Sequence, residues 1–152
     1  MAEIAKHLKR TPELSVLTDP YYVRYIINLK NPDARELRLK EEFQRLITQF
    51  DLMKLKTECQ NCTSPARFLA YMKGSFFYDL WCGDCSPYWI EHLRGSMDIF
   101  SGYMSALDYA EYYFPGDRFL ARAIIRNLAR LKGMPMKVNA RRAKIFFRGE
   151  VL

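Results

Sequence analysis

The sequence predicts a mainly helical α+β protein, a helical domain into which a metal-binding β-hairpin is inserted. Two observations lead to this prediction. Apolar side chains recur with the 3.6-residue period of amphipathic helices in the first and last parts of the chain. Between these parts, two Cys-x2-Cys pairs flank short aromatic and apolar runs that are typical of a hairpin. We expect a helical region over 1–53, a hairpin module over 54–90 and a basic helical region over 91–152, packed as one compact domain.

Proline signals divide the N-terminal region into three predicted helices. Residues 2–10 are expected to form a short helix that ends at Thr11–Pro12. Asp19–Pro20 predicts an N-cap followed by proline at the first helical position, so a second helix is expected over 21–30. Asn31–Pro32 repeats this signal and opens a longer third helix.

The third helix carries an apolar face that predicts its place against the core. Residues on this face recur at intervals of three and four, which is the spacing of neighbours on one side of a helix. They are Leu39, Phe43, Leu46, Ile47 and Phe50.

The remaining elements follow from turn signals. The runs 66–72 and 75–81 are expected to pair as a hairpin through a turn at Lys73–Gly74. A helix is predicted near 96–113, a second over 117–132 with Gly133 as its C-cap, and a last short helix over 139–147.

The four cysteines predict a metal site. Cys59 and Cys62 form one pair, Cys82 and Cys85 the other, and the 19 residues between the pairs are long enough for a hairpin that brings them together. Four thiolates at this spacing suit one structural Zn²⁺ and leave no open position for catalysis. Free thiols, disulfides and iron bound as in rubredoxin are the alternatives, and His92 could replace one ligand.

Residues 56–90 resemble the broad class of zinc ribbons and treble-clef zinc fingers. Neither Cys pair has the proline and glycine of the commonest ribbon form. Ser86 to Ile90 could start a helix, which would favour a treble clef. The two variants are both compatible with the sequence.

The net positive charge of the chain comes from its C-terminal part. The net charge is +7, and residues 117–152 hold ten Lys and Arg against Asp117 and Glu150. Arginines at intervals of four within the predicted helix 117–132 share one sector of about 120°, opposite a set of apolar residues expected to face the core: Leu120, Ile124, Leu128 and Leu131. Such a row suits the phosphates of a nucleic acid. The predicted contact residues are Arg118, Arg122, Arg126, Arg130, Lys137, Arg141, Arg142, Lys144 and Arg148.

Three other interpretations of this segment stay open. The basic face could dock an acidic protein surface or simply be solvated, and the last two helices could form a helix-turn-helix. Aromatic residues of the hairpin could also stack on bases, although core packing accounts for most of them. They are Phe68, Tyr71, Phe76, Phe77, Tyr78 and Trp81.

These features predict a small nucleic-acid-binding accessory or regulatory protein that contacts DNA or RNA. The alternative is an adaptor subunit of a larger assembly, which would dock through the same basic face. An enzyme is not expected, because no catalytic motif accompanies His7, His92 or carboxylates such as Asp108. A metal-dependent nuclease built from such carboxylates is the third class of function. A small-molecule substrate is not expected.

The composition fits a globular protein of a reducing compartment. The 152 residues are 49% hydrophobic and 14% aromatic, which is sufficient for a core. The sequence holds no run of 18 uncharged apolar residues, so no membrane span is expected. The N-terminus lacks the apolar segment of a secretory signal, which favours a cytoplasmic protein whose cysteines bind metal rather than pair as disulfides.

Overall fold

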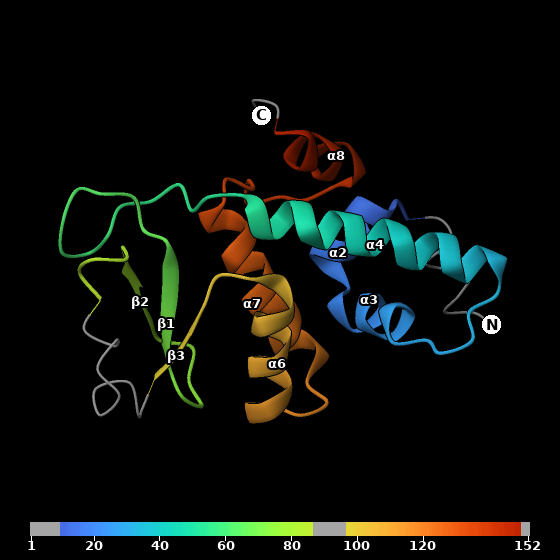
Figure 1. Ribbon diagram of the computed structural model, residues 1–152, viewed down its shortest axis with the longest axis horizontal. Coiled ribbons are helices and arrows are strands. Elements are labelled where there is room, and N and C mark those ends of the chain that lie inside the picture. Colours follow the sequence, from blue (N-terminus) through green and yellow to red (C-terminus); the bar gives the residue numbers. More distant parts are fainter. Residues whose placement is uncertain (1–9, 87–96, 150–152) are drawn as a thin grey trace.

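The computed structural model describes residues 10–86 and 97–149, which form a helical bundle with a small antiparallel sheet beside it (Figure 1). The helices are α2 (Pro12–Thr18), α3 (Pro20–Ile27), α4 (Ala34–Leu52), α6 (Tyr103–Tyr113), α7 (Arg118–Leu131) and α8 (Ala140–Arg148). The strands are β1 (Phe68–Met72), β2 (Tyr78–Trp81) and β3 (Met97–Phe100). The predicted α+β class agrees with this arrangement. None of the described helices has the length and apolar character needed to cross a membrane.

Helix α2 corrects the prediction at Thr11–Pro12, which begins a helix rather than ending one. The Thr11 hydroxyl accepts a hydrogen bond from Leu14 N at 3.2 Å, and Pro12 occupies the first helical position, where its missing N–H costs nothing. The helix predicted over 2–10 lies almost wholly outside the described residues. Asp19 N-caps α3 as predicted, with its carboxylate accepting from Tyr22 N at 3.4 Å.

Helix α4 begins two residues later than its predicted start signal. Asp33 is the N-cap, and its carboxylate accepts from Glu36 N at 2.8 Å while Glu36 accepts from Asp33 N at 2.9 Å. This reciprocal capping box is a stronger start than Asn31–Pro32, because it satisfies two backbone N–H groups together. The predicted apolar face is confirmed, with Leu39 partly buried and the other four residues buried.

The sheet confirms the predicted hairpin and adds a third strand that the sequence did not predict. Its strand order is β2-β1-β3, and both pairings are antiparallel. Residues 97–100, expected to open a helix, instead pair with β1, and Leu69 faces Phe100 in the register. The Phe100 ring stacks on Tyr71 with centroids 5.0 Å apart, a contact that the helical alternative would lose. The following helix, α6, therefore starts only at Tyr103.

The last two helices agree with their prediction. The Asp117 carboxylate caps α7 by accepting from Leu120 N at 3.0 Å, and Asn139 caps α8 by accepting from Arg142 N at 2.8 Å. Gly133 follows α7 with a φ of 110°, a conformation that favours glycine.

One hydrophobic core joins the N-terminal and C-terminal helices. Helix α2 contacts α4, α7 and α8, so the two helical regions interleave in one bundle. The sheet is attached through rings: Tyr71 lies 5.1 Å from Tyr109 of α6. The Asn127 side chain on α7 donates to the Tyr71 hydroxyl and accepts from the Tyr78 hydroxyl, both at 3.3 Å. These contacts fix the sheet, and the cysteine loops that it carries, against α6 and α7.

Candidate metal centre and basic face

The first cysteine pair lies in the loop between α4 and β1, and the second follows β2. Cys59 N donates to Ser64 O at 2.8 Å, which closes the first pair into a tight loop. Gln60 then holds this loop against β2. Its backbone N donates to Leu80 O at 2.9 Å, and its side-chain Oε1 accepts from Leu80 N at 3.2 Å. Because Cys82 comes two residues after Leu80, this double hydrogen bond brings the two cysteine pairs together.

The four thiols form one cluster. Their sulfur atoms all lie within 4.8 Å of one another, and the Cys62 and Cys82 sulfurs are 3.8 Å apart. None of the four is in a disulfide. Cys59 and Cys82 are only 4% and 5% exposed, whereas Cys62 and Cys85 are partly accessible. The predicted ligands therefore lie together and could hold a metal ion.

The electrostatics of the cluster favour a bound cation. Burial opposes ionisation of Cys59, but N–H groups of Cys82 and Asn61 outweigh it and lower the pKa of this thiol to about 6. The Asn61 side chain lowers the pKa of Cys85, yet the neighbouring thiols outweigh it and raise this pKa to about 12. A second thiolate so close to the first is unfavourable unless a positive charge offsets both.

Two further residues belong to this centre and were not predicted. Gln60 joins the first loop to β2, and Arg67 places its guanidinium beside Gly83, between the ligands of the second pair. Arg67 is exposed, and its side chain lies against the loop that carries the second pair. No sequence pattern marked either residue, because both act through a partner on another strand or loop. His92, the alternative to one of the cysteine ligands, and residues 87–90, which bear on the treble-clef variant, lie outside the described part.

The predicted arginine row lies on the solvent side of α7. Arg118, Arg122 and Arg130 are exposed, and Arg126 is partly buried. On the opposite side, Ile124 and Leu128 are buried as predicted, while Leu120 and Leu131 are partly buried. The predicted division into a basic and an apolar sector is thus confirmed for the helix itself.

Several of these basic side chains have no acidic partner in the part of the chain that is described. Arg122, Arg130, Arg141 and Lys144 form no ion pair with a described residue. Arg118 lies over the Tyr21 ring, with its guanidinium carbon 5.7 Å from the centroid. The positive charge of Arg122 and Arg130 is therefore available at the surface of α7.

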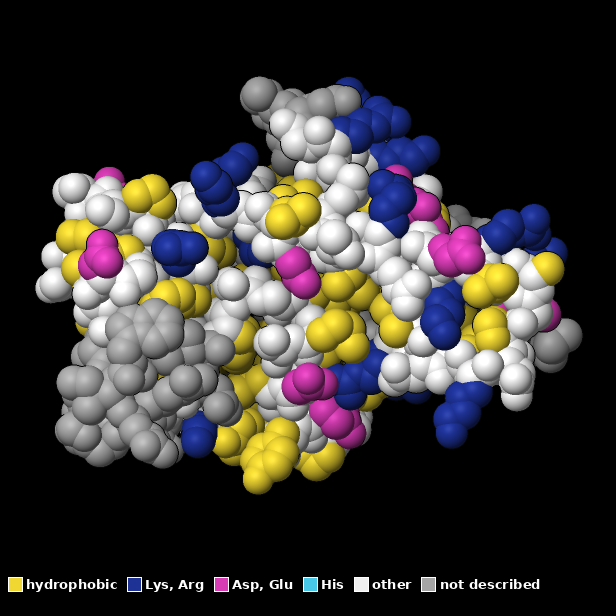
Figure 2. Space-filling view, viewed as in Figure 1, with side chains coloured by type: hydrophobic (Ala, Val, Ile, Leu, Met, Phe, Trp, Pro, Cys, Tyr) yellow, Lys and Arg dark blue, Asp and Glu magenta, His cyan; other side chains and the backbone are white. Residues whose placement is uncertain are grey.

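Two of the predicted contact residues also hold the α7–α8 connection. Arg126 donates from its guanidinium to Met136 O at 3.1 Å, and Arg142 donates to Lys137 O at 3.1 Å. The connection and α8 border a hollow of about 710 Å³, to which Lys137, Arg141 and Arg142 contribute. Figure 2 shows Lys and Arg side chains gathered over α8. Arg148 is exposed at the end of this helix.

The aromatic residues proposed for stacking divide into three groups by exposure, of which Phe68, Tyr78 and Trp81 are partly buried. Tyr71 is buried in the core, whereas Phe76 and Phe77 are exposed at the hairpin turn. Phe119, which was not among the predicted contact residues, is 72% exposed on α7. Its helical spacing places it among the arginines, but the sequence alone does not show that the ring is exposed.

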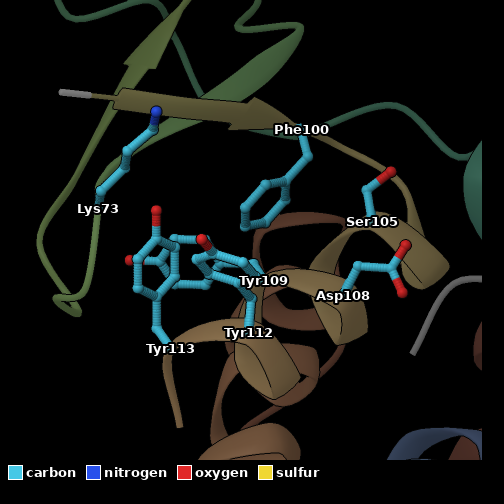
Figure 3. A pocket seen from close by; sticks show the side chains of 7 residues that line it. All are labelled: Lys73, Phe100, Ser105, Asp108, Tyr109, Tyr112 and Tyr113. Carbon is cyan, nitrogen blue, oxygen red and sulfur yellow. The ribbon is translucent and has the colours of Figure 1, made fainter. Parts of the chain in front are cut away.

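A hollow of about 460 Å³ lies between the hairpin and α6 (Figure 3). Rings from β3 and α6 form its wall, with Lys73 on one side and Ser105 and Asp108 on the other. Asp108 also pairs with Arg24 at 3.6 Å. Because the charged groups stand on opposite sides of the rings, the hollow offers no convergent set of ligands comparable to the cysteine cluster.

Comparison with known proteins assigns no family to this chain. No protein-family model matches it, no curated protein matches it, and no solved structure matches it.

Proposed function

We propose that the protein is a small zinc-stabilised nucleic-acid-binding accessory or regulatory factor that contacts phosphates through the basic face of α7 and α8. The observation that carries the proposal is the solvent side of α7, where arginines recur and no acid occurs between Arg118 and Leu131. Arginines four residues apart stand about 6 Å apart along a helix axis. This spacing resembles that of successive phosphates, which guanidinium groups bind through paired hydrogen bonds.

The proposed metal is zinc, in a structural role. A Zn–S bond of about 2.3 Å implies sulfur–sulfur edges of about 3.8 Å in a regular tetrahedron. The Cys62–Cys82 separation of 3.8 Å fits this edge, and the other pairs, within 4.8 Å, need only small movements to reach it. Four thiolates complete the coordination of zinc, so the ion would stabilise the module rather than activate a substrate.

The metal proposal is tested by elemental analysis of the purified protein. We expect one zinc ion per chain and substoichiometric iron. Replacing Cys82 by Ser should abolish stoichiometric binding. The control variant Thr63→Ser changes the residue next to Cys62 without removing a thiol, so this variant should still bind one zinc ion. A chain that purifies with all four thiols reactive and no metal would contradict the proposal.

The nucleic-acid proposal is tested by the salt dependence of binding. Affinity for DNA or RNA oligonucleotides should fall log-linearly with salt concentration, because neutralising phosphates releases condensed counterions. Arg122 and Arg130 are the residues to change to Glu, since both are exposed and form no described ion pair. The double variant should lose binding by an order of magnitude or more while its circular dichroism stays unchanged. Arg126 is less suitable, because its change would also release Met136 O.

The adaptor function is the second candidate, and one observation favours it. Phe77 and Met136 are exposed apolar side chains on two different loops, and such residues are enriched in protein interfaces. An adaptor should copurify with one fixed partner and show no salt-sensitive affinity for free nucleic acid. That outcome would replace the nucleic-acid proposal.

A further inference from the structure

We propose that the α7 face binds single-stranded nucleic acid, with Phe119 stacking on an unpaired base while the neighbouring arginines hold the backbone. This inference rests on the proposed nucleic-acid function and specifies its substrate class. It starts from an anomaly: Phe119 is a large apolar ring that is 72% exposed on an otherwise basic helix face. Because the ring is exposed to solvent, packing in the core of the described chain does not explain its presence at this position.

The placement of Phe119 on α7 links it to the arginines. At 100° per residue, Phe119 lies between Arg126 and Arg130 in angle around the helix. Arg122 is three residues further along, which is about 4.5 Å of axial rise and nearly one helical turn. Ring and guanidinium groups therefore share one surface, within the distance that separates a base from its own phosphates.

The charge of this surface is complementary to a polyanion. No Asp or Glu occurs between Arg118 and Leu131, and the carboxylate of Asp117 is engaged with Leu120 N at the start of the helix. Arginine and aromatic residues are both enriched in protein interfaces as well, so the ring alone does not select the partner. The arginines that recur along α7 with no acid among them favour a polyanion.

An exposed ring gains most from unpaired bases. In a duplex the base faces are already stacked on one another, so a phenylalanine on a convex helix meets only sugars and base edges. In a single strand each base offers a free face, and stacking on an aromatic side chain stabilises the complex without requiring a particular sequence. The arginines would bind both forms, but the ring distinguishes between them.

The test compares single-stranded and duplex oligonucleotides of equal length for the full-length protein and its variants. Replacing Phe119 by Ala should weaken single-strand binding by roughly five- to a hundred-fold, the range of one base–aromatic stack. Duplex affinity should change little, and the slope of affinity against salt should stay unchanged because no phosphate contact is lost. The variant Phe119→Tyr, which keeps a ring, should retain most of the single-strand affinity.

Two variants serve as controls. Leu52 is similarly exposed, at 77%, but lies at the end of α4, so Leu52→Ala should bind like the unchanged protein. Arg122→Ala should weaken both forms and reduce the salt slope, because it removes a phosphate contact. Thermal melting of each variant checks that the fold is retained.

The failures of the two proposals are distinguishable. Loss of binding in Arg122→Ala together with unchanged single-strand binding in Phe119→Ala would overturn the stacking proposal and leave the nucleic-acid function standing. Equal losses for both polymers in Phe119→Ala, or a larger single-strand loss in Phe77→Ala, would also overturn it. If the unchanged protein binds neither polymer in a salt-sensitive way, both proposals are wrong.

Discussion

Lys132 is a buried lysine whose surroundings disfavour its charge. The residue is 2% exposed, and its Nζ donates to Phe50 O at 2.6 Å and lies 4.5 Å from the centroid of the Phe50 ring. Burial lowers the pKa of Lys132 from 10.5 to about 8, although the nearby Asp51 carboxylate acts in the opposite direction. The carbonyl and the ring are both acceptors for a cation, which explains why the lysine is tolerated at this depth.

The lowered pKa predicts how stability depends on pH. Between about pH 8 and 10.5 the unfolded chain binds the Lys132 proton more tightly than the folded chain does, so the free energy of unfolding should rise with pH there. One proton gives a slope of at most about 1.4 kcal/mol per pH unit. Urea unfolding of the protein and of Lys132→Met between pH 7 and 9.5 measures this slope. A variant with the same slope as the unchanged protein would contradict the prediction.

Asp51 caps a helix other than its own. Gly102, the N-cap of α6, has no side chain for this purpose, and Tyr103 N instead donates to the Asp51 carboxylate of α4 at 2.8 Å. Replacing Asp51 by Ala should therefore destabilise the protein by about 1 kcal/mol, the usual cost of a lost N-cap. Asp51→Asn keeps an acceptor oxygen and should recover most of this loss. Chemical denaturation measures both, and equal stability of Asp51→Ala and the unchanged protein would refute the assignment.

The hairpin turn is fixed by one tyrosine of α6. The Tyr109 hydroxyl lies 2.8 Å from Met72 O and 2.6 Å from Ser75 O, and it accepts from Ser75 N at 3.1 Å. We expect Tyr109→Phe to cost about 1 kcal/mol, because the part-buried backbone groups of Met72 and Ser75 would lose a hydrogen-bond partner. Amide exchange in residues 72–77 should speed up together with this loss.

The chain provides a matched control for this prediction. Tyr112 is on the same helix but is 78% exposed, so Tyr112→Phe should change stability by less than about 0.5 kcal/mol. Equal effects of the two changes would show that the turn does not depend on the buried hydroxyl.

The elements that the sequence predicted well are those specified by neighbouring residues. The face of α4 from Phe43 to Phe50, the cap at Asp117 and the hairpin around Gly74 all follow from local spacing or turn chemistry. Strand β3 was missed because its partner β1 lies about 25 residues earlier, and nothing in residues 97–100 distinguishes a short strand from a first helical turn. Thr11–Pro12 was misassigned for a related reason: the same dipeptide can end one helix or begin the next.

The candidate site was predictable to the same extent. The cysteine spacing alone identified four residues that the fold brings within 4.8 Å, since each pair is close in sequence. The arginine row followed from helical period. Gln60, Arg67 and Phe119 could not be selected, because their significance depends on which surface each one faces in the folded chain.

The cysteine cluster and the helical bundle are joined, but different interactions stabilise each of them. The core formed by Val16, Phe43, Ile124 and Phe146 includes no cysteine, whereas the loops 57–66 and 82–86 bury only two thiols and two small side chains. They are connected through the sheet, which packs on α6 and α7, and through Lys56 N, which donates to Leu131 O at 2.7 Å. Loss of the metal should therefore affect the two parts unequally.

Removing the metal with a chelator should unfold the cysteine loops and leave the bundle folded. Amide exchange in 57–66 and 82–86 should rise by orders of magnitude, because coordination supplies most of the folding free energy of so small a module. Exchange in α2, α4 and α7 should rise far less, and far-UV circular dichroism should keep most of its helical signal. Cys82→Ser, without chelator, should give the same pattern. If the helices instead lose protection together with the loops, the metal centre and the bundle unfold as one cooperative unit, and the hydrogen bond from Lys56 to Leu131 is part of a tighter coupling between them.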